Sequence, residues 1–76
     1  MYTYEELNSD LAEGHEVEFY YKKNKYSISN NQKGWYLTKY HDDNYQMFNT
    51  AEELLNFGRI DSKTLKELWN EVQVET

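Results

Sequence analysis

Three adjacent side chains that can bind a metal or transfer a proton, His41, Asp42 and Asp43, lie within the stretch GWYLTKYHDDNYQMF. A metal site needs ligands that converge on one point, whereas neighbouring residues of an extended chain point to alternate faces. The calcium-loop pattern D-x-[DN]-x-[DN]-G is absent. Asp-Asp-Asn is instead typical of a turn with Asn44 in the left-handed conformation. We therefore predict a turn at residues 41–44 and no metal site.

No other group of residues in the sequence matches a known catalytic or cofactor-binding pattern. His15 is the second histidine, and nothing in the spacing predicts that it meets His41. The chain has no G-x-S-x-G, P-loop or G-x-G-x-x-G motif and no cysteine. Glu16 and Glu18 share a strand face, but an exposed charged face is the commoner meaning of that pattern. We predict no catalytic residue, no cofactor and no enzymatic activity.

The candidate binding surface is the polar face of the strands that the sequence predicts. Its members are Tyr20, Lys25, Tyr36, Thr38 and Tyr40. Tyrosine is enriched at protein interfaces, which favours an unidentified protein as the partner. Aromatic side chains beside lysines also hold single-stranded nucleic acid, which is the alternative. Tyrosine is moreover a favoured strand residue in its own right, and this propensity favours a solvated face that binds nothing over a binding face.

Charge separates these hypotheses in part. The net charge of the chain is −6, with six acids and no base in residues 1–21 and five lysines and no acid in residues 22–41. The negative total opposes a polyanion at long range. A third hypothesis is that the helix acids mimic nucleic acid and inhibit a partner, although first-turn acids also stabilise helices. The acids concerned are Glu5, Glu6, Asp10, Glu13, Glu52 and Glu53.

Three helices are expected to position the candidate face. Thr3 and Thr50 each begin a T-x-x-E capping box, and Gly14 and Gly58 follow as stops. Leu65, Leu68, Trp69 and Val72 recur with helical spacing. These signals predict helices over residues 4–12 and after Thr50, and a last helix that Asp61 or Ser62 caps. Residues 74–76 are expected to be frayed.

Alternating apolar and polar residues predict strands over residues 15–21, 25–29, 35–40 and 45–48. The predicted pairs are Tyr21 with Tyr26, Phe19 with Ile28, Ile28 with Trp35, and Tyr26 with Leu37. Asn24 is expected to take positive φ in the first turn.

Whether residues 45–48 join the sheet remains open. A two- or four-residue loop before them turns Phe48 inward, whereas a three-residue loop turns Tyr45 and Met47 inward.

These elements predict one small α+β domain that spans residues 1–76. Its two layers are a three- to four-stranded antiparallel meander and a cover of one N-terminal and two C-terminal helices, in the order α-β-β-β-(β)-α-α. Trp35 and Trp69 are expected at the centre of the interface between the layers. A chain of this size buries roughly 60% of its unfolded surface, and the 17% of aromatic residues must supply much of the core.

Composition predicts a soluble cytoplasmic protein that does not enter a membrane. The chain has no cysteine, no long apolar run and no basic start followed by an apolar stretch.

The strings EVEFYYKKNKYSISNNQKGWYL and TAEELLNFGRIDSKTLKELW resemble short uncharacterised proteins of low-GC Gram-positive bacteria and their prophages. The resemblance covers over half of the chain and rests on core, turn and cap residues. It implies a fold of the kind described and no activity, and it transfers no functional residue.

Overall fold

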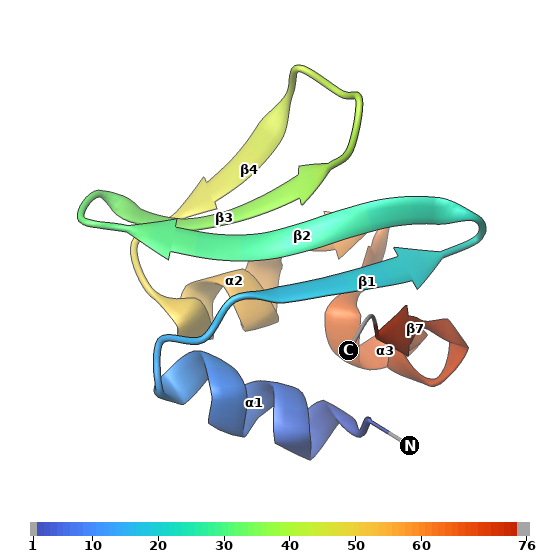
Figure 1. The fold of residues 1–76 in the computed structure, drawn as a ribbon, viewed down its shortest axis with the longest axis horizontal. Coiled ribbons are helices and arrows are strands. Elements are labelled where there is room, and N and C mark those ends of the chain that lie inside the picture. The colour runs from blue at the N-terminus through green and yellow to red at the C-terminus, as the bar shows by residue number, and fades with distance from the viewer. Residues whose placement is uncertain (1, 75–76) are drawn as a thin grey trace.

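The computed structural model describes residues 2–74 (Figure 1). The helices are α1 (Tyr4–Ala12), α2 (Ala51–Phe57) and α3 (Leu65–Leu68), and α3 continues into a 3-10 turn at Trp69–Glu71. The long strands are β1 (Val17–Tyr21), β2 (Asn24–Asn31), β3 (Gly34–Lys39) and β4 (Tyr45–Phe48). The two-residue strands are β5 (Arg59–Ile60), β6 (Lys63–Thr64) and β7 (Gln73–Val74).

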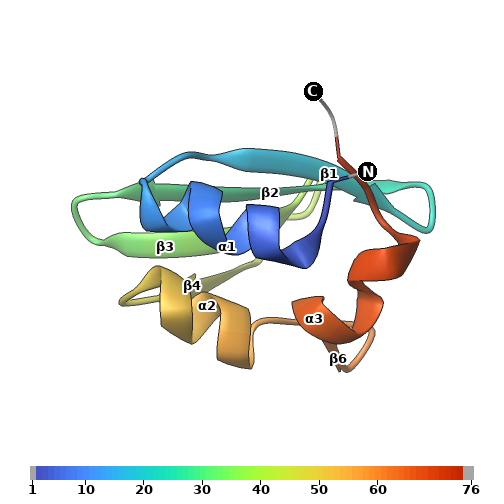
Figure 2. The ribbon, with the colours of Figure 1, turned by 90° about the horizontal axis from the view of Figure 1, so that it is seen from below.

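The main sheet has five antiparallel strands in the order β4-β3-β2-β1-β7. Figure 2 shows α1, α2 and α3 on one side of this sheet, so the other face is left uncovered by helices. The predicted α+β class and the two-layer arrangement are therefore confirmed, and residues 45–48 form the fourth strand of the meander. The fifth strand, β7, was not predicted. The expected fraying is wrong for Val74, which pairs with Phe19, while residues 75–76 lie outside the described part.

Both predicted hairpin registers are wrong by two residues. Tyr26 pairs with Phe19 and not with Tyr21, and Ile28 pairs with Leu37 and not with Trp35. The first turn is Lys22-Lys23, with φ of 50° and 68°, and Asn24 already belongs to β2. Consecutive positive φ values match the strand twist in a two-residue hairpin. A shift of two residues leaves every side chain on its predicted face, so the hydrophobic pattern could not detect the error.

The core lies between the helices and the inner face of the sheet. Its fully buried side chains include Leu7 and Leu11 of α1, Phe19 and Ile28 of the sheet, and Leu68. Trp69 is buried against Phe19, with ring centroids 5.2 Å apart. Trp35 is only partly buried at the border of this cluster, so the prediction that it is central is wrong. The tighter turn moves Trp35 opposite Asn30, at the end of the sheet.

Threonine caps all three helices, and two caps follow the prediction. The Thr3 capping box with Glu6 is complete, and Thr50 accepts a hydrogen bond from the Glu53 amide. The third cap is Thr64, whose box is closed by Glu67, so the prediction of Asp61 or Ser62 is wrong. Asp61 and Ser62 instead have φ of 54° and 67° in the turn between β5 and β6. Val72 has extended backbone after the 3-10 turn and is not helical.

The 41–44 segment is a turn, as predicted, but its left-handed residue is His41 (φ 69°) and not Asn44. The Asp42 amide donates to the Lys39 carbonyl at 3.1 Å, and the Asp42 carboxylate accepts from the Asn44 amide at 2.9 Å. These bonds occupy Asp42 in shaping the loop. The loop turns Phe48 inward opposite Trp35, which settles the choice that the sequence left open.

No helix in residues 2–74 combines the length and the apolar character needed to cross a membrane.

Candidate functional site

The candidate site is the sheet face that the helices leave uncovered, called here the outer face. The pairing register places its side chains in three cross-strand rows, because residues directly opposite each other share a face. The first row is Gln73, Tyr20, Lys25 and Tyr40, the second is Glu18, Ser27, Thr38 and Tyr45, and the third is Ser29, Tyr36 and Met47. All five predicted face residues, Tyr20, Lys25, Tyr36, Thr38 and Tyr40, therefore lie on one face.

Tyr45 and Met47 extend the outer face to the edge of the sheet, and neither was named as a site residue. Both are exposed, and the Tyr45 ring packs edge-on against Tyr36 with centroids 5.5 Å apart. The Tyr36 hydroxyl also donates to the Asn31 side chain at 3.3 Å. The strand alternation with Phe48 inward was the only signal for these two residues, and the sequence left that register open.

Lys25 sits at the centre of the first row and is held by its neighbours. Its ammonium lies 4.7 Å from the ring centroid of Tyr40, 5.8 Å from that of Tyr20, and 3.6 Å from the Glu18 carboxylate. The Tyr40 hydroxyl donates a hydrogen bond to the same carboxylate. The charge of Lys25 is therefore balanced within the face by Glu18 and by two aromatic rings.

The hydrogen bond from the Tyr40 hydroxyl holds the pKa of the Glu18 carboxyl below its usual range, and the nearby Lys25 ammonium lowers this pKa to a smaller extent. We expect Tyr40→Phe to raise the Glu18 pKa toward the ordinary glutamate value, because it removes the larger stabilising contact. Carbon-detected NMR titration of the Glu18 carboxyl measures this change. Tyr20→Phe is the matched control, since no hydrogen bond joins Tyr20 to Glu18, and it should leave the pKa unchanged.

The depressed pKa of Glu18 also predicts how the stability of the fold changes with pH. A depressed folded-state pKa means that the stabilising effect of ionised Glu18 is present above the ordinary glutamate pKa and is lost as pH falls through the folded-state value. The loss of stability on the acid side should therefore be shallower in Tyr40→Phe than in the parent. An unchanged Glu18 pKa in Tyr40→Phe would show that the hydroxyl contact is unimportant.

The lysines of the hairpin turns do not gather on the outer face. Lys22 and Lys23 form the turn between β1 and β2, and Lys33 lies in the turn after β2. Lys22 pairs with Asp61 at 3.3 Å, and this contact raises its pKa. Lys22, Lys23 and Lys33 are therefore divided between separate turns, and Lys25 is the lysine within the three rows of the outer face.

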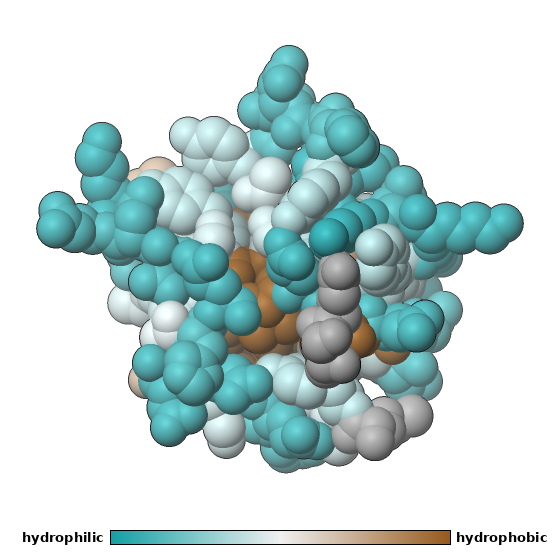
Figure 3. All heavy atoms as spheres, in the orientation of Figure 1, coloured by the Kyte–Doolittle hydropathy of each residue, from teal (hydrophilic) through white to brown (hydrophobic). Residues whose placement is uncertain are grey.

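An acidic groove of about 600 Å³ adjoins the outer face along the first half of β1. Its walls carry the carboxylates of Asp10, Glu16 and Glu18, and no lysine or arginine lines it among the described residues. The hydroxyls of Tyr2 and Tyr40 also line the groove and donate to Asp10 and Glu18. Figure 3 shows hydrophobic residues near the middle of one face of the molecule, with hydrophilic side chains beside them. The acids of the groove, together with its lining residues Val17, Ile28 and Val74, favour a positively charged group with some apolar surface.

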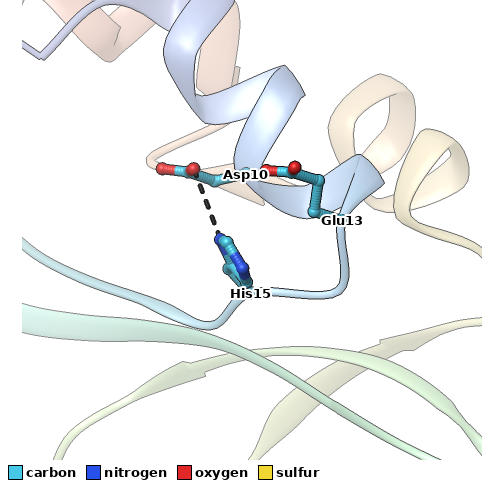
Figure 4. A group of neighbouring side chains, drawn as sticks. All are labelled: Asp10, Glu13 and His15. Atoms are coloured by element: carbon cyan, nitrogen blue, oxygen red, sulfur yellow. Dashed lines mark ion pairs between the residues drawn. The ribbon is translucent and has the colours of Figure 1, made fainter.

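The ligand atoms of His41, Asp42 and Asp43, which the sequence places side by side, do not come together as a group in the part of the chain that the structure describes. Within residues 2–74, one group of His, Asp and Glu ligand atoms lies close together, and its members are Asp10, Glu13 and His15. Figure 4 shows the His15 ring directed toward Asp10, and His15 Nδ1 lies 3.5 Å from the Asp10 carboxylate. Asp10 also accepts from Tyr2, which lowers the Asp10 pKa. The acid spacing on α1 followed by His15 could have indicated this group, and sequence reasoning did not combine the three.

The members of this group could offer a cation one imidazole and two carboxylates. All three are exposed or only partly buried, and Asp10 is already engaged by Tyr2 and His15. The absence of a metal site stays a prediction.

Comparison of the chain with known protein families, with curated proteins and with solved structures found no match.

Proposed function

We propose that the protein is a binding module without enzymatic activity that holds a protein partner on the outer face. The observation that carries the proposal is the exposure of four large side chains there: Tyr20 (40%), Tyr40 (39%), Tyr45 (60%) and Met47 (48%). Tyrosine and methionine are enriched at protein interfaces, where their large side chains bury much area. They lie on a hydrogen-bonded antiparallel sheet, so little backbone ordering is required on binding.

Single-stranded nucleic acid is the weaker alternative. Stacking modules need lysines or arginines beside the aromatic rings to meet phosphates. Here the one lysine within the three rows is balanced by Glu18, and the adjoining groove is lined by acids. The net charge of −6 further opposes a polyanion.

The nucleic-acid mimic is also weaker, because two of its acids stabilise helix ends. Glu6 accepts from the Thr3 amide at 3.1 Å, and Glu53 accepts from the Asn49 amide at 3.1 Å. These carboxylates are oriented by caps, which gives them a structural reason to be present.

The proposed setting is the cytoplasm of a bacterium. The lack of cysteine supports a reducing compartment, and the resemblance to short proteins of Gram-positive bacteria and their prophages supports the host.

Affinity capture with matched variants tests the protein-binding proposal. The full chain, Tyr45→Ser and Phe57→Ser are each immobilised and exposed to a bacterial lysate. Phe57 is the control because it is a large side chain, 64% exposed, that lies on α2 and not on the sheet. We expect one protein to be retained by the parent and by Phe57→Ser and to be reduced at least tenfold on Tyr45→Ser, since a few aromatic contacts, tyrosine among them, carry much of the binding energy of an interface.

Equal retention on all three baits, or loss on Phe57→Ser alone, would contradict the choice of surface. The nucleic-acid alternative is tested separately with a fluorescent single-stranded oligonucleotide at low salt. Saturable binding that weakens steeply as salt is raised would favour that alternative.

A further inference from the structure

The strand β4 forms one edge of the main sheet, and this edge lacks the usual protection. Within the described residues, β4 pairs only with β3. Its sequence, Tyr-Gln-Met-Phe, has no charged residue and no proline. Sheet edges are normally guarded by lysine, proline, bulges or very short strands, because their unpaired N–H and C=O groups recruit another strand. The opposite edge meets this expectation, since β7 has only two residues.

The edge is also held firmly in place. The Gln46 side chain donates to the Arg59 carbonyl at 2.7 Å and accepts from the Arg59 amide at 3.0 Å. These bonds tie the inner side of β4 to β5. On the outer side, Tyr45 packs on Tyr36. A strand fixed on both faces presents its backbone groups in an ordered row, which lowers the entropic cost of adding another strand.

We propose that the free edge of β4 receives an extended segment of the partner protein as an added strand of the sheet. This inference rests on the proposed function and names how the partner engages the outer face. Backbone hydrogen bonds to β4 would supply the alignment, and alternate side chains of the segment would lie beside Tyr45 and Met47. Because β4 is uncharged, the central residues of the segment are apolar or β-branched.

Charge around β4 indicates what flanks the segment. Exposed Asp42 and Asp43 precede the strand, and exposed Glu52 follows it. The bases Lys39 and Arg59 line a cavity that Asp42 also lines. Asp43 and Glu52 are therefore the acids beside β4 that lie outside this cavity. Lysine or arginine on either side of the apolar centre would therefore complement the acids that bracket β4.

A second copy of this chain fits the edge less well. Antiparallel pairing of β4 with itself would set Asp42 and Asp43 of one copy beside Glu52 of the other. Each copy also carries a net charge of −6. Like charges brought together in this way oppose the dimer.

The test is a selection of short random peptides on the immobilised full chain, followed by two measurements on the tightest peptide. The first is amide hydrogen exchange of the protein with and without the peptide. Added-strand pairing should slow exchange at alternate amides of β4, because only every second N–H of an edge strand faces outward. The second is a scan with backbone N-methylated versions of the peptide, where alternate positions should each weaken binding about tenfold or more.

Three results overturn the inference. Peptide binding with no change in β4 exchange, or with no alternating effect of N-methylation, removes strand addition while leaving a protein-binding outer face intact. Concentration-dependent dimerisation of the free chain that protects the β4 amides would show that a second copy is the occupant. If selected peptides perturb only α1 or α2, both the inference and the proposed function fail.

Discussion

Trp69→Ala is expected to remove a large share of the stability of the fold. Trp69 is buried in the core and contacts the rings of Phe19, Tyr2 and Tyr4, with centroids 5.2 to 6.4 Å away. Truncating a buried aromatic residue costs about 3–5 kcal/mol, partly through the cavity left behind. A chain of 76 residues has about 4–11 kcal/mol of stability in total. Chemical denaturation followed by far-ultraviolet circular dichroism measures the loss.

The matched control is Trp35→Ala. Trp35 is only partly buried, so its loss should be smaller, about 1–3 kcal/mol. Equal losses at the two tryptophans would contradict the location of the core. Trp69→Phe adds a second check, because the buried indole N–H has no hydrogen-bond partner among the described residues. Phenylalanine should therefore recover much of the stability that alanine loses.

Gly34→Ala is expected to destabilise the protein by about 2–4 kcal/mol, because two unfavourable effects combine at this position. A Cβ there would lie 2.4 Å from the carbonyl oxygen of Phe48, so β4 would have to move. The φ of Gly34 is also +152°, which side chains rarely adopt. Denaturation measures the loss, and faster amide exchange in β4 should show where it occurs.

Gly14→Ala separates the two effects. Gly14 has a positive φ of +82° but no atom within 4 Å of an added Cβ. It should therefore cost only about 1–2 kcal/mol, the usual penalty for the left-handed conformation. A loss at Gly34 no larger than at Gly14 would mean that β4 is not packed tightly against Gly34.

Much of the fold could be predicted because local chemistry and hydrophobic periodicity agree. The Thr3 box, the Thr50 cap and the alternation in β1, β2 and β3 each have a strong local signal. The register could not be predicted, because a shift by two residues leaves each side chain on the same face. Lysine is also not a residue that usually adopts positive φ, so the turn at Lys22 and Lys23 had no local signal. Thr64 was missed as a cap because Asp61 and Ser62 are also favoured cap residues.

The residues of the outer face could be predicted where the alternation of the strands that carry them was clear from the sequence. Tyr20, Tyr36 and Tyr40 follow from alternation, which survives the register error. The outward placement of Tyr45 and Met47 depends on a loop conformation set by left-handed His41, which no local sequence signal indicates. The acidic groove joins α1 to the sheet through tertiary packing, so no local pattern could reveal it.

Amide-shift mapping on the isotopically labelled chain tests the central claim most directly. The captured protein is purified and titrated into the labelled chain, and the perturbed amides are located on the fold. We predict that the largest shifts fall on β3 and β4 and on the outer-face rows that contain Tyr36, Tyr40 and Tyr45. Shifts confined to α1 and α2, with none on the sheet, would contradict the account.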